Sequence, residues 1–558
     1  GDAGFESVPK WVPHPTLVQA QQFLEDWPSL LQAQEYEIAR ERWLEIQQAL
    51  WENFPTDRPL AQPEVRSIWL DRGTIVKARY GKKLARLFDR LAAAGINTVF
   101  METVNAGYPI YPSQVAPEQN PLTRGWDPLA EAIELAHERG IELHAWVWVF
   151  AAGNQLHNRL LNLPTDYVGP ILAANPDWAN YDNRGEMIPP GQTKPFLDPA
   201  NPAVRGYLLR LLGEIANNYA IDGVQLDYIR YPFQDPAANR TYGYGLAARQ
   251  QFEQMTGVDP INLSPRESPE APLEERLRQR HLWQQWTSFR IEQVNSFVAE
   301  AGRFLRRQRP NLVISAAVFA HPEHERWQKI QQNWEVWAKR GDIDFLMLMS
   351  YALDTNRLEQ LTYPWLTSAA LNNALILPGI RLLNLPNEAA VDQIQTLRDL
   401  PAGGYGLFAV ENLNENLQTI LNRTQGARRH NASEPVPYRN PFQTALARYD
   451  ALRREWSFLL ANELFWMSSS EFGAWKDQVE ALGKALDALA TDPSNRHLTQ
   501  VKSHLNQVQA GLAAPIDVAS VNSSYRIQVW KHRLVTLATL LNYGERVVLQ
   551  RPAPVSAR

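Results

Sequence analysis

Several features that would narrow the class of this protein are absent from its 558-residue sequence. It contains no cysteine, which excludes disulfides, thiolate metal sites and cysteine nucleophiles. Its longest strongly apolar run, around residues 143–152, is much shorter than a membrane span. The formal net charge is only -5, and no Lys/Arg-rich run supplies the basic stripe that nucleic-acid binding needs. The composition indicates a globular chain with no transmembrane segment and argues against a nucleic-acid partner.

Several catalytic motifs are missing as well. The sequence has no Gly-rich phosphate loop, no GxSxG and no HExxH, so phosphoryl transfer, α/β-hydrolase and zinc-peptidase chemistry lose support. What it does have is a heavy aromatic load of 19 tryptophans and 19 tyrosines. Flat aromatic faces also stack on sugar rings, so this composition favours a carbohydrate site.

Short apolar segments alternate with amphipathic ones through the middle of the chain. Eight strands are predicted, at 65–70, 98–103, 141–149, 223–227, 313–318, 345–350, 375–380 and 404–410. Between them, helices are predicted at 82–94, 128–139, 204–219, 281–309, 328–339, 358–372 and 388–400. Eight strand–helix repeats predict an α/β fold, a (β/α)8 TIM barrel. A doubly wound open sheet is the alternative, but no GxGxxG follows the first strand.

The segments on either side of this region have helical periodicity. Residues 1–63 form a predicted helical lead-in and linker, in which Pro55, Pro59 and Pro63 mark the linker. The barrel is predicted at 64–421, a second linker at 422–441 and a helical bundle at 442–558. Within the barrel, two long insertions at 151–199 and 234–280 follow the third and fourth strands, on the side where active sites form.

Acidic side chains follow several of the predicted strands. Asp227 ends the fourth strand, Glu102 lies near the end of the second, Asp354 follows the sixth and Glu411 follows the eighth. In a barrel these strand ends converge on one mouth. Cleavage of a glycosidic bond needs two carboxyl groups, one to attack or to activate water and one to protonate the leaving oxygen. The pattern therefore predicts a glycoside hydrolase, with no metal or other cofactor.

Asp227 is the strongest candidate, because unpaired acids inside apolar strands are rare and costly. By analogy with retaining barrels that place an acid at strand four, it is predicted to be the nucleophile or electrostatic stabiliser. Asp354 is the first choice as its partner acid, followed by Glu102 and Glu411. The predicted sugar-binding residues are Arg72, Asn105, His144, Trp146, Tyr228, Arg230, Tyr351 and Arg381.

Each of these residues also has a purely structural interpretation. In this interpretation, Asp227 and Arg230 form a buried ion pair that only closes the strand. His144 is then a satisfied histidine of the barrel interior, and Glu411 caps the next helix. A second functional hypothesis follows from these alternatives, namely a barrel that binds glycans or acts as a scaffold without turnover.

The order of short segments resembles that of the glycosyl-hydrolase-like family 10 barrels. The resemblance rests on residues 66–70, 108–113, 144–146, 197–199, 231–232 and 342–345, and on Asp222-Gly223-Val224-Gln225-Leu226-Asp227-Tyr228. It implies a TIM barrel and points most firmly to Asp227. It also implies export, which here means a periplasmic, secreted or lipid-anchored protein after signal removal.

Members of this family include a division-site enzyme that cuts peptidoglycan glycan strands lacking stem peptides. The resemblance therefore makes such strands the leading expected substrate. The additional C-terminal helices are expected to offer a docking surface for a protein partner in the cell envelope.

Overall fold

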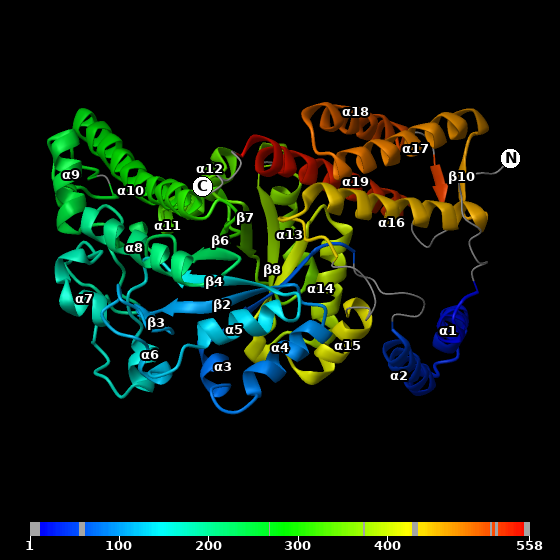
Figure 1. Ribbon diagram of the computed structural model, residues 1–558, viewed down its shortest axis with the longest axis horizontal. Helices are drawn as coiled ribbons and strands as arrows, with labels where there is room; N and C mark the ends of the chain where they lie inside the picture. The colour runs from blue at the N-terminus through cyan, green and yellow to red at the C-terminus, as the bar shows by residue number, and fades with distance from the viewer. Residues whose placement is uncertain are drawn as a thin grey trace, which may run out of the picture.

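The protein is built around a closed eight-stranded parallel barrel (Figure 1). The structure is a computed structural model and describes residues 12–54, 62–266, 268–371, 374–426, 434–513, 516–518 and 523–551. Strand β1 pairs with both β9 and β2, which closes the ring. The barrel strands are β1 (Val65–Leu70), β2 (Thr98–Asn105), β4 (Glu142–Trp148), β5 (Gly223–Asp227), β6 (Val313–Phe319), β7 (Phe345–Met349), β8 (Leu375–Arg381) and β9 (Gly404–Phe408).

The predicted TIM barrel is therefore confirmed, and all eight predicted strands are present. Strands covered on both faces read as nearly continuous apolar runs, and every residue of β1, β2 and β5 is buried. One short strand is additional. β3 (Tyr108–Pro109) folds back antiparallel onto the end of β2, and the turn between them is too short to leave a separate apolar run in the sequence.

Helices surround the barrel and cover the outer faces of its strands. They are α3 (Arg72–Lys77), α4 (Lys83–Ala93), α5 (Pro128–His137), α8 (Pro202–Asn218), α10 (Leu273–Gln308), α11 (Glu323–Lys329), α12 (Trp334–Arg340), α13 (Thr355–Leu366), α14 (Asn387–Asp399) and α15 (Glu415–Gln425). The single helix predicted at 328–339 is wrong. Gln331 has φ +48°, a left-handed conformation that no α-helix continues through, so the segment divides into α11 and α12.

The two long insertions contain helices of their own. The loop after β4 carries α6 (Gln155–Leu160) and α7 (Pro170–Ala174), and the loop after β5 carries α9 (Leu246–Thr256). The ends of the first loop are held together by an antiparallel contact between Ala151 and Phe196. Its distal part is therefore anchored beside the mouth of the barrel.

The C-terminal region is helical, as predicted. It comprises α16 (Pro441–Ala461), α17 (Ser469–Thr491), α18 (Asn495–Gly511) and α19 (Ser523–Gly544), together with a small sheet of β10 (Phe465–Met467) and β11 (Ile516–Val518). Its core is aromatic, because Trp456 contacts both Trp475 and Trp530 with ring centroids 5.1 and 6.0 Å apart. A short π-helical turn, Glu545–Gln550, follows α19.

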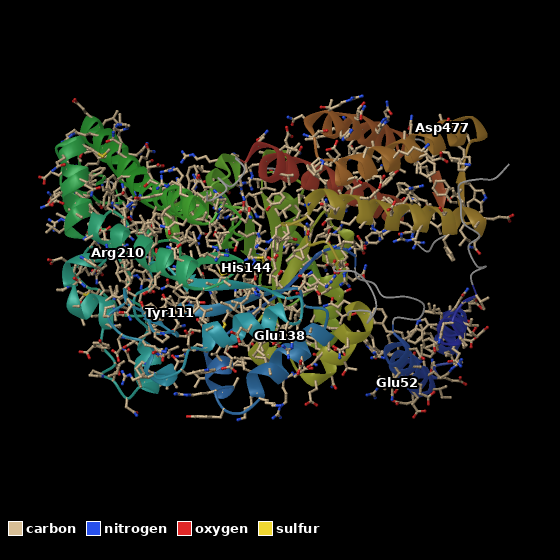
Figure 2. All side chains as sticks on the ribbon, in the orientation of Figure 1. Glu52, Tyr111, Glu138, His144, Arg210 and Asp477 are labelled. Atoms are coloured by element: carbon tan, nitrogen blue, oxygen red, sulfur yellow. The ribbon has the colours of Figure 1, made fainter. Side chains whose placement is uncertain are left out.

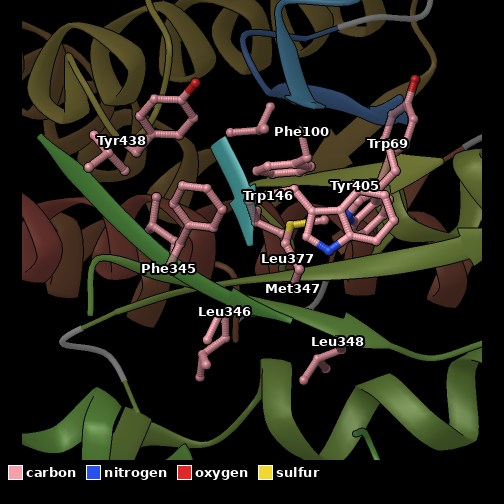
Figure 3. Packing of buried hydrophobic residues seen from close by; sticks show 14 of the residues in the cluster. Trp69, Phe100, Trp146, Phe345, Leu346, Met347, Leu348, Leu377, Tyr405 and Tyr438 are labelled. Carbon is pink, nitrogen blue, oxygen red and sulfur yellow. The ribbon is translucent and has the colours of Figure 1, made fainter. Parts of the chain in front are cut away.

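The segment that leads into α16 closes the amino-terminal end of the barrel. Tyr438 stacks on Phe345 with ring centroids 5.2 Å apart, and its hydroxyl lies 2.7 Å from Thr98 Oγ1. Figure 3 shows Tyr438 above Phe345 and Phe100 at one end of the barrel interior. Arg439 adds an ion pair with Glu142 at 2.7 Å. The C-terminal helices are thus joined to the end of the barrel opposite the predicted site.

The N-terminal helices form a separate hairpin, α1 (Pro15–Gln32) and α2 (Tyr36–Asn53), packed around the buried side chain of Phe23. Arg423 of α15 donates a hydrogen bond to the carbonyl of Glu52, which ties the hairpin to the barrel. Among the residues described, none of the helices combines the length and apolar character that crossing a lipid bilayer requires.

One predicted boundary can be compared with these elements. The barrel boundary predicted at residue 421 falls inside α15, which continues to Gln425. The last turn of this helix is polar in sequence and gives no apolar signal, although its Gln425 is buried. Pro55, Pro59 and residues 427–433 of the second predicted linker lie outside the described residues.

We expect Tyr438 to couple the stability of the barrel to its C-terminal helices. The Tyr438→Phe variant, which loses the hydrogen bond to Thr98, should lower the free energy of unfolding by about 1 kcal/mol. Tyr438→Ala also empties the space between the rings and should cost about 3–5 kcal/mol. Both values can be measured by urea unfolding followed through tryptophan fluorescence. Tyr80→Ala is the control, because this tyrosine is 71% exposed; an equal loss there would contradict the role given to Tyr438.

Candidate active site

A cavity of about 300 Å³ opens at the carboxyl-terminal end of the barrel. This is the end at which TIM-barrel enzymes place their active sites. Six of its twelve lining residues are aromatic, and three carry carboxyl groups. The lining residues are Trp69, Asp71, Glu102, Trp146, Trp148, Asp227, Tyr228, Arg230, Ala317, Met349, Tyr351 and Phe408.

Asp227, the last residue of β5, is only 9% exposed, and hydrogen bonds fix its carboxyl group. The indole of Trp146 donates to Oδ2 at 2.8 Å, and the backbone N–H of Tyr228 donates to Oδ1 at 2.6 Å. Burial raises the pKa of Asp227, while these donors and the nearby charges of Arg230 and Lys194 oppose that rise. Both oxygens are therefore oriented by groups that favour the anion.

The backbone turns sharply directly after Asp227. Tyr228 has φ +48°, in the left-handed region that a bulky residue rarely adopts. This conformation lets the N–H of Tyr228 bond back to the Asp227 carboxyl. It also directs the chain toward Arg230, so a locally costly backbone geometry coincides with the predicted catalytic residue.

Glu102 is the second buried carboxyl group of the cavity, with 4% of its surface exposed. The backbone N–H of Arg72 donates to Oε2 at 2.7 Å, and the Asn105 amide donates to Oε1. Burial nevertheless dominates and raises the pKa of Glu102 to about 7. Near neutral pH this carboxyl therefore has a substantial protonated population and can act as an acid.

The barrel places Glu102 and Asp227 two strands apart. In the ladder β2–β4–β5, Glu102 is level with Trp146 and Asp227 is level with Trp148. The β2–β4 register shifts between Glu102 and Val104, which marks a bulge. Bulges often re-aim side chains beside active sites, and this one lies directly at Glu102.

The structure brings six of the predicted residues to the cavity wall and places two others behind it. Glu102, Trp146, Asp227, Tyr228, Arg230 and Tyr351 line the cavity. Arg72 and Asn105 instead hold the Glu102 carboxyl through their hydrogen bonds. The Arg72 backbone and the Asn105 side chain thus support an acid, whereas the prediction gave both residues a sugar-binding role.

Asp354, the first choice as partner acid, does not line the cavity. It is exposed and caps α13, where its carboxyl accepts a hydrogen bond from the backbone N–H of Arg357 at 2.8 Å. Glu411 also lies outside, with a side chain that is 57% exposed and 3.7 Å from Lys77 Nζ. Both residues follow barrel strands, but the turns after β7 and β9 carry them away from the mouth. Among the four predicted acids, Glu102 is therefore the one that shares the cavity with Asp227.

His144 and Arg381 were predicted to bind sugar, and neither lines the cavity. His144 is fully buried near the amino-terminal end of β4, deep in the barrel (Figure 2). There its ring packs against Phe100 and Tyr438, with centroids 5.6 and 5.4 Å away. Arg381 ends β8 with an exposed side chain. For His144 the structural interpretation fits the observed packing.

Sequence reasoning missed several residues of the site. Trp69, Trp148, Met349 and Phe408 line the cavity. Lys194 approaches it from the long loop after β4, with Nζ 5.9 Å from the Trp148 ring centroid and 5.8 Å from that of Tyr228. The tryptophans could have been found from strand alternation, because Trp146 and Trp148 have the same parity. No local signal marks Lys194.

Arg230 makes no ion pair with Asp227 within the part of the chain that the structure describes. Its guanidinium donates to the carbonyl of Tyr231 at 2.8 Å and lies 4.9–5.5 Å from the ring centroids of Phe196, Tyr228, Phe233 and Phe319. A closed Asp227–Arg230 pair, the structural alternative for this segment, is therefore not formed. Aromatic faces surround the cation instead.

The sequence model of the family described as "Glycosyl hydrolase-like 10" matches residues 64–394, which include seven of the eight barrel strands and both buried carboxyl groups. The chain belongs to this family. The family resemblance seen in the sequence is confirmed.

Two curated relatives, each named a glycosyl hydrolase, match part of the chain. Glycosyl hydrolase DigH of Escherichia coli (strain K12) is 25% identical over 210 residues, which cover 34% of this chain and 45% of that protein. Glycosyl hydrolase YngK of Bacillus subtilis (strain 168) is 28% identical over 204 residues, covering 32% and 37%. The matched region thus spans less than half the length of these curated relatives.

One solved structure that this chain resembles is the PgaB (BpsB) glycoside hydrolase domain from Bordetella bronchiseptica. It is 15% identical, with a TM-score of 0.45, and the match covers 66% of this chain and all of that one.

The raised pKa of Glu102 predicts a pH-dependent cost of folding. A carboxyl with a pKa near 4.5 when unfolded and about 7 when folded holds its proton more tightly in the native state. Its stabilising contribution is complete below about pH 4.5 and is lost as the pH rises through 7. Glu102→Gln cannot ionise, so its stability relative to wild type should improve by up to about 3 kcal/mol between pH 4.5 and pH 8.

Thermal and urea unfolding across this pH range test the prediction. Glu411→Gln is the matched control, because its side chain is largely exposed; its difference from wild type should not change with pH. A constant offset between Glu102→Gln and wild type would show that Glu102 titrates normally.

Proposed function

We propose that the barrel is a glycoside hydrolase in which Asp227 and Glu102 form the carboxyl pair. The observation that carries the proposal is the meeting of two buried carboxyl groups on one aromatic-walled cavity. The membership of the chain in the glycosyl hydrolase-like 10 family supports the same chemistry.

The surroundings of the two carboxyls suit different tasks. Asp227 accepts hydrogen bonds on both oxygens and lies near two cations, and these contacts stabilise its anion against the effect of burial, as attack or stabilisation of an oxocarbenium-like transition state requires. Glu102, with a pKa of about 7, holds a proton that it can give to the departing glycosidic oxygen as the carbon–oxygen bond breaks. Trp146 and Trp148 offer flat faces for the sugar ring.

The proposed substrate is a bacterial polysaccharide, with peptidoglycan glycan strands that lack stem peptides as the leading choice. The family resemblance and the two relatives named glycosyl hydrolases support a glycan, and the aromatic walls fit sugar rings. An extracytoplasmic location, periplasmic, secreted or lipid-anchored, is proposed on the same basis. Docking of an envelope partner on α16–α19 remains a prediction.

Incubation with purified glycan strands, with and without stem peptides, tests the hydrolase. Wild type should release defined oligosaccharides, identified by mass spectrometry. Asp227→Asn should lower the rate by about 10³-fold or more, because the carboxylate charge is lost while the shape is kept. Circular dichroism and the unfolding midpoint should show that this variant is folded. Turnover at the wild-type rate would remove Asp227 from the mechanism.

Substitutions at Asp354 and Glu102 test which of these two residues is the partner acid. Since Asp354 caps α13, its loss should cost at most about 1 kcal/mol of stability and leave cleavage intact. Glu102→Gln should instead abolish most cleavage of substrates with poor leaving groups. If wild type binds strands but releases no products, the barrel is a non-catalytic glycan binder, the second hypothesis.

A further inference from the structure

Two cations border the cavity close to Asp227, and within the described residues neither makes an ion pair with a carboxylate. They are Lys194, from the long loop after β4, and Arg230, from the turn after β5. Lys194 Nζ lies 5.8 Å and the Arg230 guanidinium carbon 5.1 Å from the same Tyr228 ring centroid. Both charges are therefore concentrated around a single aromatic ring of the wall.

The loop holds Lys194 in this position through its backbone. Thr193 and Pro195, its two neighbours, accept hydrogen bonds at 2.9 Å from the N–H groups of Gln155 and Ala152. Phe196, two residues further on, faces the same side of this extended segment and packs its ring 5.5 Å from Arg230. The same anchored segment therefore carries Lys194 and the ring that packs against Arg230.

The charges around the cavity do not balance. Lys194 and Arg230 contribute two positive charges, Asp227 contributes at most one negative charge, and Glu102 is partly protonated near neutral pH. The third carboxyl of the lining, Asp71, is engaged at the start of α3, where the N–H and the hydroxyl of Thr74 donate to its oxygens at 2.8 Å. Both Asp227 oxygens already accept hydrogen bonds from Trp146 and Tyr228. Burial and the neighbouring Arg230 charge lower the pKa of Lys194, and the Asp227 charge only partly opposes this. Desolvated cations without a counterion are costly unless a ligand supplies the anion.

We propose that Lys194 and Arg230 form a subsite for a carboxylate carried by a sugar residue of the substrate. This inference rests on the proposed function and deepens it. In glycan strands without stem peptides, the lactyl ether of N-acetylmuramic acid ends in a free carboxylate, whereas an attached stem peptide converts that group to a neutral amide. The two cations thus account physically for a preference for strands without stem peptides. Uronic acids are the other sugars that carry a carboxylate.

Binding is measured by calorimetry in the Asp227→Asn background, so that cleavage does not interfere. The probes are strands with free lactyl carboxylates, the same strands after conversion of the carboxylates to N-methylamides, and an oligogalacturonate. We expect the methylamide strands to bind about tenfold to hundredfold more weakly than the free-acid strands, as the loss of a charge-assisted contact predicts. Added salt should reduce this preference.

In this background, Lys194→Gln should weaken the binding of the free-acid strands only, and so should abolish most of the preference. Lys194→Arg, which keeps the positive charge, should retain the preference. Lys83→Gln is the matched control, since Lys83 is an exposed lysine at the start of α4, and it should change nothing. Tighter binding of the oligogalacturonate would support the carboxylate subsite and assign it to ring carboxylates.

Equal binding of free-acid and methylamide strands, or no binding of any probe, would overturn the subsite. So would a preference that persists in Lys194→Gln. These outcomes are separate from the hydrolase test. If wild type cleaves free-acid and methylamide strands at equal rates, the subsite is refuted and the hydrolase activity stands. If free-acid strands bind more tightly but wild type releases no products, the hydrolase activity is refuted and the subsite stands.

Discussion

Closure of the parallel sheet between β1 and β2 is the constraint on which the site depends. The register that runs from Ser67 opposite Thr98 to Leu70 opposite Met101 completes the ring. Because every strand of the ring runs in the same direction, all carboxyl-terminal ends reach one rim. Glu102 and Asp227, which are far apart in the sequence, therefore face one cavity. In an open sheet, β1 and β2 would not be held in this register, and the Arg72 N–H that follows β1 would not be fixed against the Glu102 carboxyl on β2.

The two carboxyls acquire different properties from the same fold. Each is buried, and burial raises the pKa of both. Asp227 receives an indole N–H and a backbone N–H and has the charges of Arg230 and Lys194 nearby. Glu102 receives a backbone N–H and a neutral amide, and the nearby charge of Arg72 is opposed by that of Asp71. A cation lowers the energy of an anion over several ångströms in a poorly solvated site, while a neutral dipole acts only at contact. The two carboxyls thus differ in the charges that surround them, two cations beside Asp227 and an opposed cation–anion pair beside Glu102.

The sequence predicted the barrel well because buried parallel strands are local signals, each visible as an apolar run between helices. It predicted the site less well, since the position of a side chain around the rim depends on register and on turn geometry. Asp354 and Glu411 follow their strands as Asp227 does, yet turns carry them outside. His144 lies two residues before Trp146 on the same face of β4, which places it deeper in the barrel. Lys194 depends on a fold of the long loop that no sequence pattern near it reveals.

The strands carry the two carboxyls and the loop after β4 carries Lys194, and this separation affects specificity. The strands fix the carboxyls through a closed hydrogen-bonded ring, so their geometry tolerates little change. The two arms of the loop after β4 are held together by hydrogen bonds from Ala152 to Pro195 and from Gln155 to Thr193. The loop carries the cation that faces the aromatic wall. Substitutions in the loop can therefore alter the charge that the cavity presents to a sugar without moving Glu102 or Asp227. Surface loops accept sequence changes at low cost, whereas buried strands do not. Barrels of this kind can therefore keep one reaction and change their substrates through this loop.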